Sequence, residues 1–252
     1  MRNVIYTFLV GDYDVLKEPE VRTPGWDYLC FTDNTKLTST SWDIRPVPKR
    51  CKICGDPKKT ASRIKIEHYS VIDSAYDIVI SMDASMTVLG NLDEFVADIG
   101  FDGYDFMALE HTQRSCVYKE AQSVLDLRFD YVGVVNTQME RYREEGYPKN
   151  NGLWLSGLMV RRNGSSSLRK ACQIWAHEYT NGSCRDQLSL NYAFWRSELL
   201  GHPVQFKALP PPRSAYGLPA GAKRDCVLHT FRRGPHRPGV SRIRRSGKSK
   251  PR

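Results

Sequence analysis

The chain alternates short apolar runs rich in β-branched residues with longer segments of helical spacing, and this alternation limits the folds it can adopt. Strands that alternate with helices predict an α/β fold with a mixed, mostly parallel sheet covered by helices on both faces. The predicted strands cover residues 4–10, 26–32, 42–47, 77–82, 106–109, 153–161 and 201–209, and the predicted helices cover 60–75, 91–100, 116–145, 166–178 and 185–195.

The excess positive charge of the chain is confined to its C-terminal segment. Residues 230–252 contain nine Lys and Arg residues and no acid, so the other residues carry 28 basic side chains against 28 acidic ones. This segment is rich in Gly, Pro and Ser and cannot bury enough apolar surface to fold alone. We therefore predict a single domain over residues 1–231 and a disordered basic tail over 232–252. The tail either aids solubility or binds a polyanion such as nucleic acid through Arg232, Arg233, Arg237, Arg242, Arg244 and Arg245.

The cysteines indicate a reduced protein. There are seven of them, an odd number without the spacing of a disulfide framework. Cys51 and Cys54 form a single CxxC, for which a turn with two free thiols is favoured over a zinc site completed by distant ligands. No apolar stretch reaches the length of a membrane span, and the first residues do not match a signal peptide. We therefore expect a cytoplasmic location.

A lone carboxylate follows the strand that reads as most deeply buried. The run Ile78–Ile80 leads to Asp83, and Met86 and Val88 continue the apolar pattern beyond it. Ligands bind beyond the carboxyl ends of strands in such sheets, and a nearly buried carboxylate needs a cation beside it. Asp83 is thus either a turn residue or a ligand of a divalent metal, with Ser85 able to assist. The other polar residues at strand ends are Asp12, Asp14, Asp33, His111 and Ser156.

Two further groups of polar residues lie at predicted helices. Arg185, Asp186 and Gln187 begin one helix, where they either favour the helix dipole or point at a ligand. Arg63 and Lys65 follow a basic loop and either reach phosphate groups or lie on a solvated face. The chain lacks a P-loop, a GxGxxG after the first strand, a GxSxG and an HExxH, which disfavours kinase, dehydrogenase and hydrolase functions.

An ordered set of segments resembles a known family. The segments are YTFLVGDYD, DYLCFTDN, SRIKIEH, YDIVISMDAS, HTQRSCVYKEA, LWLSGLMVRR and SCRDQLSLNYAFW, spread over about residues 3–210. In this order they are similar to hexosyltransferase-like glycosyltransferases of the GT-A (Rossmann-like) fold. That family was formerly catalogued as a domain of unknown function and has plant Golgi, bacterial and viral members.

The resemblance implies a nucleotide-sugar donor, usually a UDP-sugar. Asp83-Ala84-Ser85 stands at the DxD metal motif in reduced form, and His229 resembles the late histidine that completes an Mn²⁺ or Mg²⁺ site. Arg185, Asp186 and Gln187 match the catalytic segment that flanks the transferred sugar in retaining relatives. The donor-binding residues expected from the resemblance and from the strand ends are Thr7, Gly11, Tyr13, Arg63, Lys65, Asp83, Ser85 and Ser156.

These expectations combine into transfer of a hexose from the donor to a hydroxyl acceptor. Cationic groups would stabilise the departing diphosphate, and a carboxylate such as Asp186 would stabilise the oxocarbenium-like centre. The favoured acceptor is viral DNA with hydroxymethylated pyrimidines, because the basic tail can contact phosphates. The alternatives are a bacterial polysaccharide or lipid-linked glycan as acceptor, and a degenerate polyanion-binding module. Four tyrosines either stack on bases or sugars or simply pack helices, namely Tyr118, Tyr131, Tyr142 and Tyr147.

Overall fold

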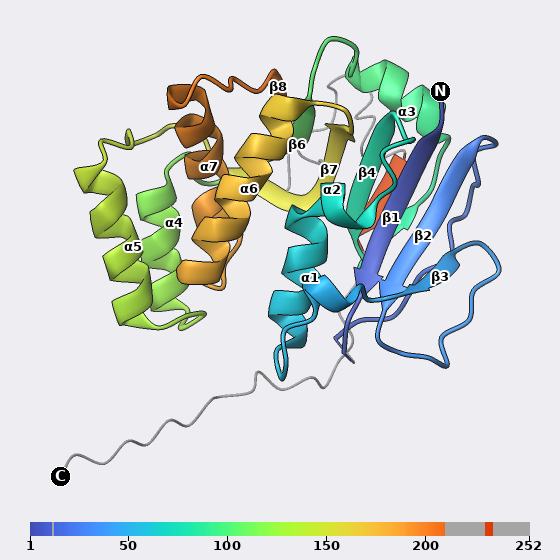
Figure 1. Cartoon of the computed structure of the whole chain (residues 1–252), viewed down its shortest axis with the longest axis horizontal. Helices are drawn as coiled ribbons and strands as arrows, with labels where there is room; N and C mark the ends of the chain where they lie inside the picture. The colour runs from blue at the N-terminus through green and yellow to red at the C-terminus, as the bar shows by residue number, and fades with distance from the viewer. Residues whose placement is uncertain (12, 210–229, 234–252) are drawn as a thin grey trace.

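The computed structural model describes residues 1–11, 13–209 and 230–233, and its main body is one β-sheet flanked by helices (Figure 1). The strands are β1 (Asn3–Leu9), β2 (Trp26–Thr32), β3 (Asp43–Pro46), β4 (Ile78–Asp83), β5 (Met86–Val88), β6 (Phe106–Glu110), β7 (Trp154–Arg162), β8 (Phe206–Leu209) and β9 (Phe231–Arg233). The helices are the 3-10 turn η1 (Lys49–Cys51), α1 (Pro57–Ile66), α2 (His68–Val71), α3 (Leu92–Ile99), α4 (Val117–Asp126), α5 (Val132–Glu144), α6 (Ser166–Asn181) and α7 (Gln187–Leu199).

The main sheet has seven strands in the order β3-β2-β1-β4-β7-β6-β8. Its neighbours are parallel except for β7, which runs antiparallel to both β4 and β6. This confirms the predicted mixed, mostly parallel α/β sheet. The reversal of β7 also has a local consequence, because Met82 near the end of β4 pairs with Leu158 in the middle of β7, and the earlier residues of β7 lie toward the edge where β4 ends. Ser156 is therefore brought to the edge of the sheet where Asp83 ends β4.

The two faces of the sheet bury different side chains of the same strands. On β1, Ile5 and Leu9 pack in the core that includes α3, whereas Tyr6 and Phe8 pack against the face that includes Ile64 of α1. Both sides are buried because helices cover both, as a near-continuous apolar strand requires. Asp83 pairs in register with Phe8, so it belongs to the α1 face.

Several predicted elements are confirmed and others differ in their bounds. Asn91 caps α3 as expected, its Oδ1 accepting from the backbone N–H groups of Asp93 and Glu94. The predicted helix over 60–75 is instead two helices, because Glu67 leaves helical geometry with a ψ of 42°. The segment 116–145, predicted to be mostly helical, contains α4 and α5, with Arg128 at a φ of 53° between them.

None of the helices in the described part of the chain is long and apolar enough to cross a membrane.

A small second sheet pairs β5 with β9 in antiparallel orientation, with Met86 opposite Arg233 and Val88 opposite Phe231. Strand β9 therefore extends past residue 231, the predicted end of the domain.

Candidate functional site

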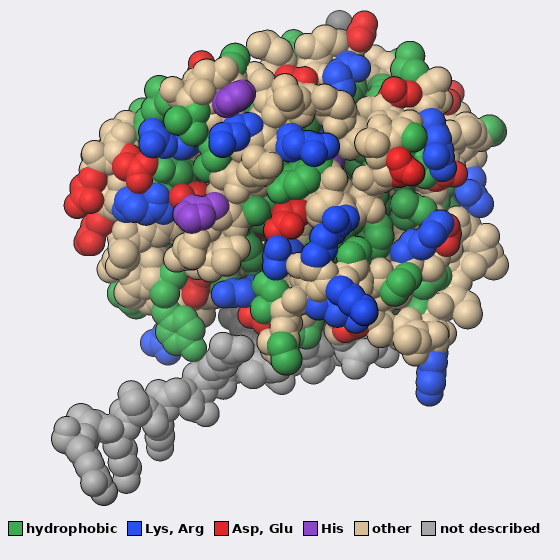
Figure 2. All heavy atoms as spheres, viewed as in Figure 1, with side chains coloured by type: hydrophobic (Ala, Val, Ile, Leu, Met, Phe, Trp, Pro, Cys, Tyr) green, Lys and Arg blue, Asp and Glu red, His purple; other side chains and the backbone are tan. Residues whose placement is uncertain are grey.

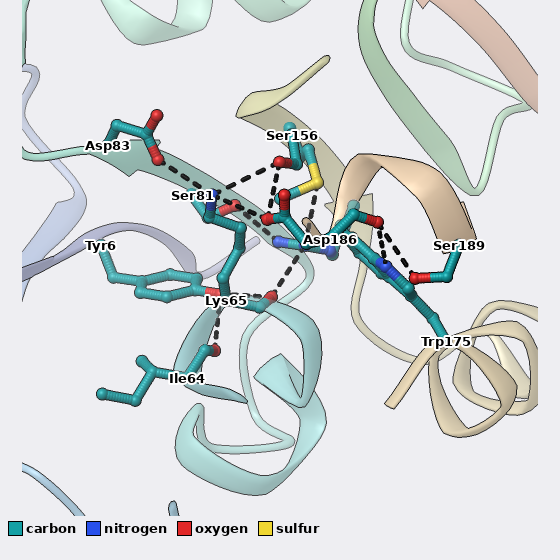
Figure 3. Close-up of polar contacts among 11 residues, drawn as sticks. Tyr6, Ile64, Lys65, Ser81, Asp83, Ser156, Trp175, Asp186 and Ser189 are labelled. Atoms are coloured by element: carbon teal, nitrogen blue, oxygen red, sulfur yellow. Dashed lines mark hydrogen bonds and ion pairs between the residues drawn. The ribbon is translucent and has the colours of Figure 1, made fainter. Parts of the chain in front are cut away.

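A buried lysine at the carboxyl edge of the sheet contacts side chains from three other segments. Lys65 lies near the end of α1, Asp83 ends β4, Ser156 lies in β7, and Asp186 precedes α7. The Lys65 Nζ is 3.1 Å from Asp83 Oδ1, 3.2 Å from Asp186 Oδ2 and 3.3 Å from Ser156 Oγ. Figure 3 shows these side chains directed at the ammonium group. We refer to Lys65, Asp83, Ser156 and Asp186 as the lysine cluster.

The Lys65 side chain is only 10% exposed, so its charge depends on its partners. Burial lowers the pKa of Lys65, but the nearby carboxylates of Asp186 and Asp83 outweigh that effect and raise it overall. A lysine ammonium has three N–H donors, and the three partners use all of them. The charge of Lys65 therefore balances one of the two carboxylate charges while the ammonium group orients both, and the lysine cluster keeps one net negative charge.

Asp186 is oriented through both its side chain and its backbone. Ser156 Oγ donates to its Oδ2 at 2.9 Å, and the indole Nε1 of the fully buried Trp175 donates to its carbonyl at 2.9 Å. Burial raises the pKa of Asp186, but Lys65 and the Ser156 hydrogen bond outweigh that effect and lower it overall. Asp186 is thus an ionised carboxylate held in one orientation, with 17% of its side chain exposed.

The segment before Asp186 is fixed by residues from the α4–α5 region. Asp130 Oδ2 accepts from Ser183 Oγ at 2.6 Å and from the Cys184 N–H at 2.7 Å. Gln138 Oε1 accepts from the Ser183 N–H at 2.9 Å. At Gly182 a Cβ would lie 2.5 Å from Gln138 Nε2, so a larger residue there would displace the Gln138 side chain. These contacts set the position of Asp186.

A buried arginine supports the lysine cluster from beneath. Arg161 of β7 is fully buried, and its guanidinium donates to Ser81 Oγ at 2.7 Å and to the Lys65 carbonyl at 3.0 Å. A cation is favourable at a helix C-terminus, where carbonyl groups lack helical partners. Arg161 is not among the site residues predicted from the sequence. The available signal was an arginine directly after the apolar run Leu158–Val160 of this strand.

Three of the predicted donor-binding residues, Thr7, Gly11 and Tyr13, lie apart from the lysine cluster. Thr7 is fully buried and pairs in register with Met82, which packs in the α3-side core, so it lies on the opposite face from the lysine cluster. Gly11 has a φ of +70°, and its N–H donates to Asp33 Oδ1 at 2.9 Å. Tyr13 is 61% exposed. The structure thus brings none of these three into the lysine cluster.

The other predicted donor and catalytic residues divide into two groups. Arg63 forms an ion pair with Glu67 of the next turn, Nε to Oε1 at 3.0 Å, while Lys65 lies in the cluster. Gln187 is 8% exposed, and its buried Nε2 has no hydrogen-bond partner in the structure. Arg185 lies with its guanidinium carbon 5.0 Å from the Phe129 ring centroid. Gln187 and Arg185 adjoin Asp186 in the chain, whereas Arg63 is engaged elsewhere.

The described residues do not provide the donor set that a catalytic divalent metal needs. Asp83 is paired with Lys65, Ser85 is fully buried with its carbonyl accepting from Lys17, and His229 lies outside the described residues. Groups of three or more His, Cys, Asp and Glu suited to a metal are absent from the part of the chain that the structure describes. In the CxxC, Cys51 is buried and Cys54 is exposed. No catalytic step is therefore assigned to a metal ion.

Histidine 111, at the end of β6, acts as a turn residue. Its Nδ1 accepts from the backbone N–H groups of Gln113 and Arg114, both at 3.1 Å. Burial lowers the pKa of His111, an effect that the nearby Glu120 only partly offsets. Of the other strand-end candidates, Asp14 Oδ1 accepts from the Val15 N–H, and Asp12 lies outside the described residues.

The predicted stacking and nucleic-acid residues have mixed outcomes. Tyr142 and Tyr147 are buried and Tyr142 stacks on Tyr192 at 3.7 Å, so these two tyrosines pack helices, whereas Tyr131 is 60% exposed. Tyr118 is half-buried, its hydroxyl donating to the Tyr147 carbonyl. In the basic segment, the backbones of Arg232 and Arg233 belong to β9. The remaining predicted arginines, Arg237, Arg242, Arg244 and Arg245, lie outside the described residues.

Comparisons with known proteins add an overall likeness at low identity. No protein-family model matches the chain, and no curated protein does. Among solved structures, the chain is similar to the crystal structure of mouse xyloside xylosyltransferase 1 in its apo form, with a TM-score of 0.47 and 11% identity. The match covers 83% of this chain and 85% of that one. Any functional assignment therefore depends on the site itself.

Proposed function

We propose that the chain is a glycosyltransferase that moves a hexose from a nucleoside diphosphate sugar, in the favoured case a UDP-sugar, to a hydroxyl acceptor. The observation that supports this best is the lysine cluster at the carboxyl edge of the sheet. Two carboxylates, Asp83 and Asp186, are paired with one lysine and remain partly exposed, at 23% and 17% of their side chains. Paired carboxylates suit a reaction that builds positive charge on a sugar ring.

The residues of the lysine cluster have separate roles in this proposal. Asp186 lies beside the anomeric carbon, where its charge stabilises the oxocarbenium-like centre, and Asp83 accepts hydrogen bonds from sugar hydroxyls. Lys65 and Ser156 hold the Asp186 carboxylate in orientation. The neighbouring Gln187 Nε2, buried and without a hydrogen-bond partner among the described residues, is a donor available to the same ligand.

The bond changes balance without any further reactant. The bond between the anomeric carbon and the β-phosphate oxygen breaks, and its electron pair leaves with the nucleoside diphosphate. The acceptor oxygen forms the new bond to that carbon, and its proton passes to the departing phosphate. Retention of anomeric configuration is the outcome we propose, with attack on the face the phosphate leaves.

The departing diphosphate needs cations beside it. The one cation of the lysine cluster, Lys65, is already paired with Asp83 and Asp186. Arg185 directly precedes Asp186, and Lys58 lies close by, since its Nζ is 3.4 Å from Cys184 Sγ. Arg185 presents a planar set of donors suited to phosphate oxygens. We assign the stabilisation of the leaving group to these two side chains.

The acceptor we favour is DNA that carries hydroxymethylated pyrimidines. The support is the basic C-terminal segment, whose nine Lys and Arg residues are unopposed by acid. Such a segment provides phosphate contacts that do not depend on base sequence. The target base would leave the stack to present its hydroxyl.

The test combines donor turnover with analysis of the acceptor. The protein is incubated with a panel of nucleotide sugars and with DNA that contains or lacks hydroxymethylcytosine or hydroxymethyluracil, and digested nucleosides are analysed by mass spectrometry. We expect a hexose-sized gain on the hydroxymethylated base only. Asp186→Asn should abolish the gain, whereas Asp126→Asn, an exposed carboxylate on α4, should leave it unchanged.

Two outcomes would change the assignment. Nucleotide release without a gain on DNA would keep the transferase and move the acceptor to a polysaccharide or lipid-linked glycan. The absence of turnover with every donor would favour a polyanion-binding module, a function that the fully buried Ser85 in the reduced DxD motif also fits.

A further inference from the structure

A second basic region lies on the folded body, apart from the C-terminal segment. The loop KRCKICGDPKK over residues 49–59 forms η1 and the start of α1, and it carries five basic side chains. Figure 2 shows several Lys and Arg side chains over the part of the surface formed by η1 and α1. We call this the basic loop surface, defined by Lys49, Arg50, Lys52, Lys58 and Lys59.

The loop is anchored, so these charges have a fixed arrangement. Cys51 is fully buried, and Thr60 Oγ1 accepts from the Ile53 N–H at 2.9 Å, which ties the loop to α1. Asp56 caps α1, its Oδ1 accepting from the Lys59 N–H at 2.9 Å. The basic loop surface is thus part of the folded domain, and its side chains emerge from ordered backbone.

The five cations lack acidic partners in the part of the chain that the structure describes. No ion pair there involves any of them, and Lys49, Arg50, Lys52 and Lys58 are exposed. The neighbouring acids are engaged elsewhere, since Glu67 pairs with Arg63 and Asp33 accepts from the Gly11 N–H. The one acid of the loop, Asp56, is occupied as the cap of α1, and five basic side chains against this single carboxylate produce a positive local field.

The basic loop surface adjoins the lysine cluster. Lys58 contacts Cys184, two residues before Asp186, and Lys65 belongs to the same helix as Lys58 and Lys59. A polyanion lying on this surface would therefore pass beside Asp186. The residues along this path all belong to the folded body, and none belongs to the C-terminal segment.

We infer that the basic loop surface binds the phosphate backbone of DNA and guides the acceptor to the lysine cluster. The inference extends the proposed function, because it names the surface that the acceptor would use. A nucleic acid fits better than a membrane, since the large exposed hydrophobic side chains of the described residues lie outside residues 49–59. Membrane-surface binding needs an apolar face beside the charge, whereas phosphate contacts need only the charge.

The experiment measures DNA binding by the full chain without any sugar donor. Fluorescence anisotropy with a labelled 30-base-pair duplex gives the dissociation constant between about 50 and 300 mM salt, a range in which phosphate contacts dominate. The test variant carries Lys49→Gln, Arg50→Gln and Lys52→Gln. The matched control carries Lys119→Gln, Arg143→Gln and Lys149→Gln, which are exposed and remove the same charge from the α4–α5 region.

We expect the test variant to bind about tenfold more weakly at the lowest salt and its salt slope to be shallower by about 3, because each of the three lost phosphate contacts removes about 0.9 from the slope. The control should bind within about twofold of the parent protein. Equal binding by parent and test variant would overturn the inference, and so would equal weakening of both variants. Tighter binding to vesicles with anionic lipid than to DNA would also overturn it.

Failure here is distinguishable from failure of the proposed function. Binding is measured without sugar transfer, so an inactive protein can still show the expected difference between the two variants. Conversely, the test variant could still modify DNA and bind it with the salt dependence of the parent protein. That result would support the proposed function and refute the role of the basic loop surface in DNA binding.

Discussion

The lysine cluster makes a strong prediction about stability, because Lys65 is the only cation there that contacts both carboxylates of the cluster among the described residues. Lys65→Met keeps the length and apolar stem of the side chain and removes its charge. Asp83 and Asp186 then lose the positive charge of Lys65, although their side chains are only 23% and 17% exposed. Removing one partner of a buried ion pair costs about 3–5 kcal/mol, and the partial exposure places this case near about 3 kcal/mol.

The assay is urea unfolding at pH 7, in which a loss of that size lowers the midpoint by about 1 M if the slope is about 3 kcal/mol per M. The double variant Lys65→Met with Asp186→Asn should recover part of the loss, because one unpaired charge is removed, giving a coupling of about 1–3 kcal/mol. A cost below about 1 kcal/mol, or a coupling near zero, would refute the argument that Lys65 holds these carboxylates.

The pH dependence of the same variant provides an independent check. In the parent protein the pKa of Asp186 is lowered, so its contribution is present above its unfolded value and is lost as the pH falls through the folded value. Without Lys65, burial instead raises the pKa of this carboxyl group, and protonation relieves the penalty. The gap in unfolding free energy between parent and Lys65→Met should therefore be largest at pH 7 and shrink toward pH 4.

Three further predictions test other parts of the structure. Gly182→Ala should displace Gln138, lower the unfolding free energy by about 1–2 kcal/mol and slow donor turnover. The control Gly133→Ala, which has open space around its Cβ position, should leave stability unchanged or raise it slightly. Burial keeps the pKa of His68 well below its usual value, so the unfolding free energy should fall by about 1.4 kcal/mol per pH unit below about pH 6.5. The stability of His68→Gln, measured by thermal unfolding, should lack this dependence on pH. Thr7→Val should leave stability unchanged or higher, because the Thr7 hydroxyl is buried without a hydrogen-bond partner among the described residues. Calorimetry should show unchanged nucleotide affinity, because Thr7 lies on the opposite face of the sheet from the lysine cluster.

The amino-acid sequence determined the elements and the fold class, because these depend on local periodicity. Apolar runs and helical spacing located β1, β2, β4, β6 and β7 to within a few residues, and Asn91 identified its helix start. Asp83, at the end of an apolar run, was also recognisable as an unusual carboxylate. Local pattern did not predict the break at Glu67, since the residues on both sides keep apolar spacing and the break depends on how the two helices pack.

Only the tertiary structure decided which polar residues meet. Lys65 and Asp186 are 121 residues apart, and their contact depends on the reversed direction of β7 and on the loop that Asp130 and Gln138 fix. Sequence spacing likewise did not separate Lys65, which points into the lysine cluster, from Arg63, which pairs with Glu67. Which ionised groups neutralise one another is set by distances of about 3 Å between segments far apart in the chain, and those distances exist only once the sheet has formed.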